Sequence, residues 1–193
     1  MCHGYGELAQ GFLANFEPVA DASRTIIAPE ALSRFYLDGT RGGSHVASSV
    51  GATWMTREDR DHEIADQVSY LDTLYDVVMA GVALDAAPRV TVLGFSQGVA
   101  TVCRWLDRGR TRAHRLVCWG GAIPDDVALA DGSPIRASAL SLVVGSRDVY
   151  ATPDRVAQQE ARLRAAGMPF RTLGFVGGHR LDDATILALA AAA

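Results

Sequence analysis

Short apolar runs alternate with amphipathic stretches along most of the chain. Four apolar runs bounded by polar or turn-forming residues predict buried strands at 90–93, 115–119, 139–144 and 170–175. Apolar residues at helical spacing predict four helices over 61–84, 99–109, 153–166 and 181–192. Strands that alternate with helices form a mostly parallel sheet covered by helices on both faces. The pattern therefore predicts an α/β fold.

The first third of the chain is less regular. Apolar residues between Leu8 and Phe16 predict a first helix that Pro18 stops, and Thr25 to Ala28 predicts a short buried strand. Residues 30–60 mix glycine and serine with aromatic residues and show no period, so we expect a lid or a substrate wall there. A surface loop with a few apolar anchors is the alternative.

Size and composition limit the classes of function. The 193 residues show no repeat or linker, so we expect one domain over 1–193. A net charge of −4 argues against a nucleic-acid partner, which would need a concentrated basic face. All 18 basic residues are arginines, which excludes Schiff-base, pyridoxal and Walker-type lysine chemistry.

The cysteines and the hydropathy of the chain indicate in which cellular compartment we expect the protein. The three cysteines, Cys2, Cys103 and Cys118, cannot all pair, which favours buried free thiols in a reducing environment over a disulfide pair. We find no stretch of about 20 apolar residues and no charged segment followed by an apolar one at the start. We therefore expect a soluble, cytoplasmic protein without stable membrane insertion.

The stretch Gly94-Phe95-Ser96-Gln97-Gly98 joins a predicted strand directly to a predicted helix. Flanking glycines suit a sharp turn that pushes the serine hydroxyl out of the sheet. A serine there is a candidate nucleophile, because the free amides at the helix start, including that of Gln97, can stabilise an oxyanion. An ordinary glycine-flanked turn is the alternative.

Four segments in chain order resemble the phospholipase/carboxylesterase group of the α/β-hydrolase superfamily. They are His3-Gly4-Tyr5-Gly6-Glu7, Gly94-Phe95-Ser96-Gln97-Gly98, Gly145-Ser146-Arg147-Asp148 and Gly178-His179. The resemblance implies the order oxyanion loop, serine, aspartate, histidine, with the amide of Tyr5 as the second oxyanion donor. It also implies a strand before the oxyanion loop, for which the chain has no residues, so N-terminal strands of the fold are expected to be missing. Either the sequence continues upstream, or something else fills the position, such as a strand from a partner in a homodimer.

Two positions complete a candidate triad with Ser96. Asp148 lies in a turn after a buried run, at the carboxyl end of a predicted strand, where open α/β sheets place their sites. Asp154 is better suited to capping the next helix. His179 follows the last predicted strand beside two glycines, and both positions match those of the resembling family.

The substrate pocket and metal ligands are less defined. Five residues are candidates for an apolar acyl pocket, each with a core position as the alternative: Phe35, Tyr36, Trp54, Met55 and Ile123. Acidic residues around His62 could suggest a metal, but no second ligand cluster accompanies them, and acidic residues at a helix start are expected from its dipole. No G-x-G-x-x-G follows a strand, which argues against a nicotinamide or flavin site. We therefore expect neither a metal nor another cofactor.

The sequence thus predicts a serine hydrolase that cleaves small carboxylic esters through an acyl-enzyme. The resemblance implies short to medium acyl esters, lysophospholipids or acyl thioesters as substrates. An acyltransferase or peptidase on the same triad is an alternative. A hydrolase-fold protein that binds an ester-like ligand without turnover is another.

Overall fold

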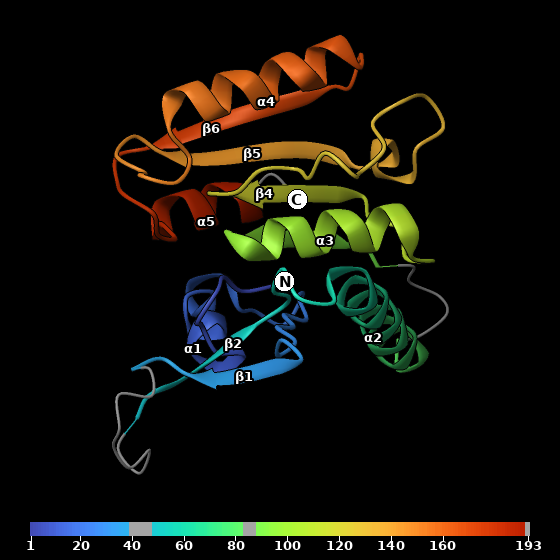
Figure 1. Ribbon diagram of the computed structural model, residues 1–193, viewed down its shortest axis with the longest axis vertical. Coiled ribbons are helices and arrows are strands. Elements are labelled where there is room, and N and C mark those ends of the chain that lie inside the picture. Colours follow the sequence, from blue (N-terminus) through green and yellow to red (C-terminus); the bar gives the residue numbers. More distant parts are fainter. Residues whose placement is uncertain (39–47, 83–87, 192–193) are drawn as a thin grey trace.

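A parallel four-stranded sheet forms the centre of the molecule (Figure 1). The computed structural model describes residues 1–38, 48–82 and 88–191. The strand order β3-β4-β5-β6 follows the chain order, and the bounds are β3 (Thr91–Phe95), β4 (Arg115–Trp119), β5 (Ala139–Gly145) and β6 (Phe170–Phe175). The four predicted strands are confirmed. Because all four run parallel, their carboxyl ends meet at one edge of the sheet.

Each helix falls in a segment where the apolar spacing predicted one. Their bounds are α1 (Ala9–Ala14), α2 (Arg60–Ala80), α3 (Gln97–Arg108), α4 (Pro153–Ala165) and α5 (Asp183–Ala191), with 3₁₀ turns η1 (Glu17–Val19) and η3 (Pro134–Ala137). Helix α2 ends at Ala80, followed by Gly81, four residues before the predicted end. Within the described ranges, no helix is long and apolar enough to cross a membrane.

The alternation of strand side chains divides the core into two layers. Val92, Leu116 and Leu142 belong to one buried cluster with apolar residues of α2, α3 and α4. Their chain neighbours Leu93 and Val117 belong to a second cluster with α1, η1 and α5. Successive side chains of a strand point to opposite faces, so each strand contributes to both layers. The expected sheet with helices on both faces is confirmed.

The first residues of the chain occupy the position beside β3. Cys2 forms an isolated parallel bridge with Gly94: its N–H donates to the Leu93 carbonyl at 2.8 Å, and its carbonyl accepts from the Phe95 N–H at 3.0 Å. The expected strand is therefore represented by one bridged residue. These two bonds satisfy backbone groups of β3 that an empty position would leave unpaired.

A small antiparallel hairpin stands beside the main sheet, where an irregular segment was expected. Strands β1 (Ser33–Tyr36) and β2 (Val50–Thr53) pair with Phe35 opposite Gly51. Figure 1 shows this pair with α1 on the side of the molecule away from β6. Residues 39–47 of the predicted lid lie outside the described residues.

The strand predicted at Thr25 to Ala28 is wrong. These residues belong to no strand, and Ile26 and Ala28 instead pack, partly buried, against the second core cluster. Their apolar side chains pack against the core without a sheet partner.

The three cysteines are buried and none forms a disulfide. The sulfur atoms of Cys103 and Cys118 lie 3.8 Å apart, between α3 and β4. The predicted free thiols are thus found in the core.

Candidate active site

Ser96 stands at a sharp turn between β3 and α3. Its φ of 53° and ψ of −117° belong to a backbone region that residues other than glycine rarely adopt. The flanking glycines make this turn fit. A β-carbon on Gly94 would lie 2.6 Å from the Val99 nitrogen, and one on Gly98 would lie 2.7 Å from the His3 carbonyl oxygen. The turn therefore needs glycine on both sides because the strand, the helix and the N-terminal segment meet there.

Three loops at the carboxyl edge of the sheet bring Ser96, His179 and Asp148 into contact. The His179 Nε2 lies 2.8 Å from the Ser96 Oγ, and its Nδ1 lies 2.8 Å from the Asp148 Oδ2. With the proton on Nδ1, the ring donates to Asp148 and accepts from the serine hydroxyl. The three residues form one hydrogen-bonded chain in the order that a nucleophile, a base and an orienting acid require.

The Asp148 carboxylate is buried and well hydrogen-bonded. Burial opposes its ionisation, but N–H groups of Ala151 and Tyr150 and the His179 ring donate to it, so its pKa lies below the ordinary value for aspartate. The two backbone amides reach Oδ1 at 2.9 Å and 2.8 Å. The carboxylate is therefore held ionised and in a fixed orientation.

The His179 ring is packed on two sides. The Phe95 ring centre lies 4.9 Å away, and the Tyr150 ring meets it edge to face at 4.7 Å. Behind it, Gly120 has a φ of +61°, and a β-carbon there would lie 3.1 Å from the His179 Cε1. The loop after β4 thus lies directly against the triad, and a side chain at position 120 would displace the imidazole.

The His3 to Glu7 turn lies beside Ser96. A β-carbon on Gly4 would lie 3.2 Å from the Ser96 Cβ, and the Gly4 N–H donates to the Glu7 carboxylate at 2.6 Å. His3 is fully buried, with its Nδ1 2.8 Å from the Gly4 carbonyl and its Nε2 accepting from the Ala31 N–H at 3.1 Å. The Nε2 also lies 3.2 Å from the Glu30 carboxylate, so the His3 ring ties this turn to the segment before β1.

Two backbone amides near the serine hydroxyl have no acceptor. Within the described part of the chain, neither the Tyr5 N–H nor the Gln97 N–H donates a hydrogen bond. These are the two amides expected for an oxyanion hole. The Tyr5 side chain points away from the core, is 61% exposed and stacks on Phe35 at 5.0 Å.

The Gln97 side chain connects two elements of the fold. Its Oε1 accepts from the Trp54 N–H at 3.0 Å, and its Nε2 donates to the Met55 carbonyl at 2.8 Å. The residue after the serine therefore fastens the end of β2 to the start of α3.

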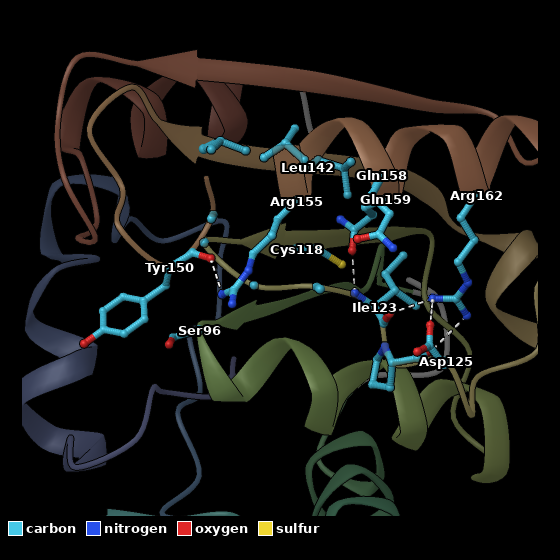
Figure 2. A pocket seen from close by; sticks show the side chains of 17 residues that line it. Ser96, Cys118, Ile123, Asp125, Leu142, Tyr150, Arg155, Gln158, Gln159 and Arg162 are labelled. Carbon is cyan, nitrogen blue, oxygen red and sulfur yellow. Dashed lines mark hydrogen bonds and ion pairs between the residues drawn. The ribbon is translucent and has the colours of Figure 1, made fainter. Parts of the chain in front are cut away.

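A cavity of about 560 Å³ opens at Ser96 and extends between the loop after β4 and helix α4 (Figure 2). Its inner wall is apolar, comes from β4, β5 and the loop after β4, and includes Cys118, Ile123, Leu142 and Val144. Its outer wall is polar and comes mainly from α4, with Arg155, Gln158, Gln159 and Arg162. A site of this size holds a small ligand.

Among the five acyl-pocket candidates, only Ile123 lines this cavity. Trp54 is a core residue, 1% exposed, and its Nε1 donates to the His3 carbonyl at 2.9 Å. Met55 contacts the buried Arg104, Phe35 stacks on Tyr5, and Tyr36 is 46% exposed on the hairpin. These four lie away from this cavity because β2 enters the core beside α3, and a role for them in an acyl pocket stays a prediction.

Sequence reasoning missed the cavity wall formed by α4. Arg155, Gln159 and Arg162 recur at helical spacing on one face of that helix, and the cavity is the space that this face covers. Their spacing of four and three residues, next to the apolar positions Val156 and Leu163, is the signal that could have identified them.

The acidic residues at the start of α2 form local contacts. The His62 Nδ1 lies 2.7 Å from the Asp59 Oδ1, and both side chains are exposed. Across the described ranges, no group of three His, Cys, Asp or Glu side chains could hold a metal ion.

The sequence matches no protein-family model and no curated protein sequence. Solved structures match nearly the whole chain. The structure of Arabidopsis thaliana SOBER1 superposes with a TM-score of 0.70 at 13% identity, covering 98% of this chain and 93% of SOBER1. Zea mays acyl-protein thioesterase 2 gives 0.65 at 18% identity, covering 98% and 90%, and esterase PE8 gives 0.64 at 20%, covering 98% and 87%. These likenesses confirm the α/β-hydrolase fold that the four sequence segments implied.

Proposed function

We propose that this chain, which has the α/β-hydrolase fold, is a serine hydrolase that cleaves small carboxylic esters through an acyl-enzyme. The observation that carries the proposal is the hydrogen-bonded chain from Ser96 Oγ through His179 to Asp148, with both links at 2.8 Å. The names of two similar structures, an esterase and an acyl-protein thioesterase, agree with this chemistry.

The first half-reaction transfers the acyl group to Ser96. The Ser96 Oγ attacks the ester carbonyl carbon while the His179 Nε2 takes the hydroxyl proton. The Tyr5 and Gln97 amides donate to the carbonyl oxygen as it becomes negative, and each such donor contributes about 3 kcal/mol of transition-state stabilisation. His179 then gives its proton to the departing alcohol or thiol. Asp148 stabilises the imidazolium throughout.

The second half-reaction returns the enzyme to its starting state. His179 takes a proton from water, and the resulting hydroxide attacks the acyl carbonyl. The bond to Ser96 breaks, the carboxylic acid leaves, and Ser96 regains its proton from His179. Atoms and protons balance over the cycle without another reactant.

The cavity has room for a small acyl or alcohol group of the ester. Its volume of about 560 Å³ accommodates a short chain rather than a long lipid tail, and its inner wall is apolar beside Ser96. The Tyr150 side chain, 62% exposed, stands at the entrance next to His179.

Mass spectrometry after exposure to a fluorophosphonate probe tests the proposal. We expect one adduct on Ser96, no adduct with Ser96→Ala, and labelling slowed strongly by His179→Ala. Ser146→Ala is the matched control, since that serine also follows a strand end but lies outside the triad, and its labelling should equal that of the unmodified protein.

Hydrolysis of 4-nitrophenyl esters of two to eight acyl carbons completes the test. Hydrolysis of these esters by protein that the probe also labels supports the proposal. Transfer of the acyl group to an added alcohol or amine instead of water would favour an acyltransferase. A folded protein with neither adduct nor hydrolysis would contradict it and favour ligand binding without turnover.

A further inference from the structure

The cavity next to Ser96 contains two arginines whose surroundings differ. Both lie on α4, seven residues apart, and both line the same wall. Figure 2 shows Arg155 on the half of the cavity that holds Ser96 and Tyr150, and Arg162 with Asp125 on the other half.

Arg162 is held by the protein through both of its terminal nitrogens. Its guanidinium donates to the carbonyl oxygens of Ile123, Pro124 and Val127 and lies 3.3 Å from the Asp125 carboxylate. It holds the loop after β4 in place and has its own counter-charge. Arg162 is therefore a structural residue.

Arg155 has one acceptor. Its Nη1 donates to the Tyr150 carbonyl at 2.9 Å, which holds the side chain over the cavity. Arg155 is exposed, and across the described residues it joins no ion pair and its side chain donates only to Tyr150, so its Nε and Nη2 face solvent. The guanidinium is thus positioned by one hydrogen bond while donors remain for another group.

The position of Arg155 in α4 does not stabilise the helix. The residue lies in the first turn, where the helix dipole disfavours a positive charge. An anion that enters the cavity would meet this guanidinium at its open side, with Gln159 on the same wall.

We propose that Arg155 selects substrates in which the group entering the cavity carries an anion, a carboxylate or a phosphate. This inference rests on the proposed ester hydrolase function and narrows its substrate class. The apolar inner wall accommodates the chain between the ester and the anion, and the guanidinium binds the anion through charge-assisted hydrogen bonds. Arg155 is a specificity residue and takes no part in bond breaking.

A matched pair of esters tests the inference. In 4-nitrophenyl hydrogen glutarate, a carboxylate replaces the terminal methyl group of 4-nitrophenyl pentanoate, so the two differ mainly in charge. We expect a higher kcat/KM for the glutarate ester, and a fall of about 10- to 100-fold in the ratio of the two kcat/KM values in Arg155→Ala. The loss should appear mainly in KM, and Arg155→Lys should restore part of the preference. The Ser96→Ala rate is subtracted because the carboxylate can assist cleavage in solution.

A control variant and a second pair of esters, which differ in the alcohol part, complete the experiment. Arg164→Ala removes the same charge from α4, but Arg164 pairs with Glu160 and does not line the cavity, so the ratio should stay unchanged. The acetyl ester of 4-hydroxybenzoate against phenyl acetate places the charge on the alcohol side, and a preference there that depends on Arg155 also supports the inference. Competition by glutarate or by inorganic phosphate, weakened in Arg155→Ala, distinguishes the two anions.

Binding separates this inference from the catalytic proposal. Calorimetry with Ser96→Ala and glutarate measures recognition without turnover, and binding lost on adding Arg155→Ala supports the inference even if no ester is cleaved. Equal kcat/KM ratios in the unmodified protein and Arg155→Ala, together with no glutarate binding that depends on Arg155, would overturn it. A missing Ser96 adduct would count against the hydrolase function alone.

Discussion

The backbone of Cys2 leaves no room for a side chain at Gly98. A β-carbon at position 98 would overlap the Cys2 carbonyl group, with the carbonyl carbon 2.7 Å away. The same Cys2 carbonyl accepts from the Phe95 N–H, one residue before Ser96. The N-terminal segment, β3 and α3 therefore meet at a single point beneath the serine.

Gly98→Ala should destabilise the protein by about 2 kcal/mol or more, because the backbone atoms in its way cannot move without breaking the Cys2 pairing. Urea unfolding measures the change. Gly11→Ala is the control: it lies in α1 with nothing within 4 Å of an added β-carbon, so it should leave stability unchanged or raise it slightly. Equal unfolding midpoints for the two variants would contradict the close contact.

Asp148→Asn should change the dependence of stability on pH. The pKa of Asp148 is lowered in the folded protein, so its stabilising contribution is present above the ordinary aspartate pKa of about 3.9 and is lost as pH falls through the folded value. The free energy of unfolding should therefore differ most between the two proteins above pH 5 or so, and the difference should shrink toward pH 2. Urea titrations across this range check it, and a difference independent of pH would contradict the assignment.

Asp126→Asn should destabilise the protein by about 2 kcal/mol, because it removes the counter-charge of a buried arginine. The Asp126 carboxylate lies 3.0 Å from the Arg104 Nε and 2.9 Å from its Nη2, and it also contacts Arg60 and Arg108. Thermal unfolding measures the loss.

Asp131→Asn provides the comparison for that variant. The Asp131 carboxylate lies 3.1 Å from Arg136 but is 96% exposed, so its loss should change little. If both variants unfolded at the same temperature, the contribution of the Asp126 cluster would be refuted.

The regular part of the fold could be predicted because each strand there carries its own signal. β4 and β6 have the predicted bounds, since each is a short run between turn-forming residues and needs no distant information. The sequence could also predict that Ser96, Asp148 and His179 lie close together, because each follows a strand and parallel strands end at one edge of the sheet. Their catalytic roles remain a proposal.

The parts that sequence reasoning missed depend on tertiary contacts. The hairpin strand β1 is largely exposed and lacks the alternation of a half-buried strand. The local sequence therefore does not indicate its pairing with β2. Trp54 was a candidate for the pocket with a core position as the alternative, and hydrogen bonds from its indole to His3 and from its amide to Gln97 hold it in the core. Arg155 was overlooked because the sequence does not distinguish it from other arginines on helices. Only the packing of α4 places it at the cavity that Ser96 also lines.

The bridge between Cys2 and Gly94 also bears on how the chain acquires its structure during synthesis. The Ser96 turn follows β3, which pairs with Cys2, and Ser96 itself contacts His179, which is translated much later than Cys2. Contacts between such distant segments form slowly, since long loops must close first. Because the contact with His179 forms only after the last strand has been translated, the candidate active site would be among the last features of the fold to appear.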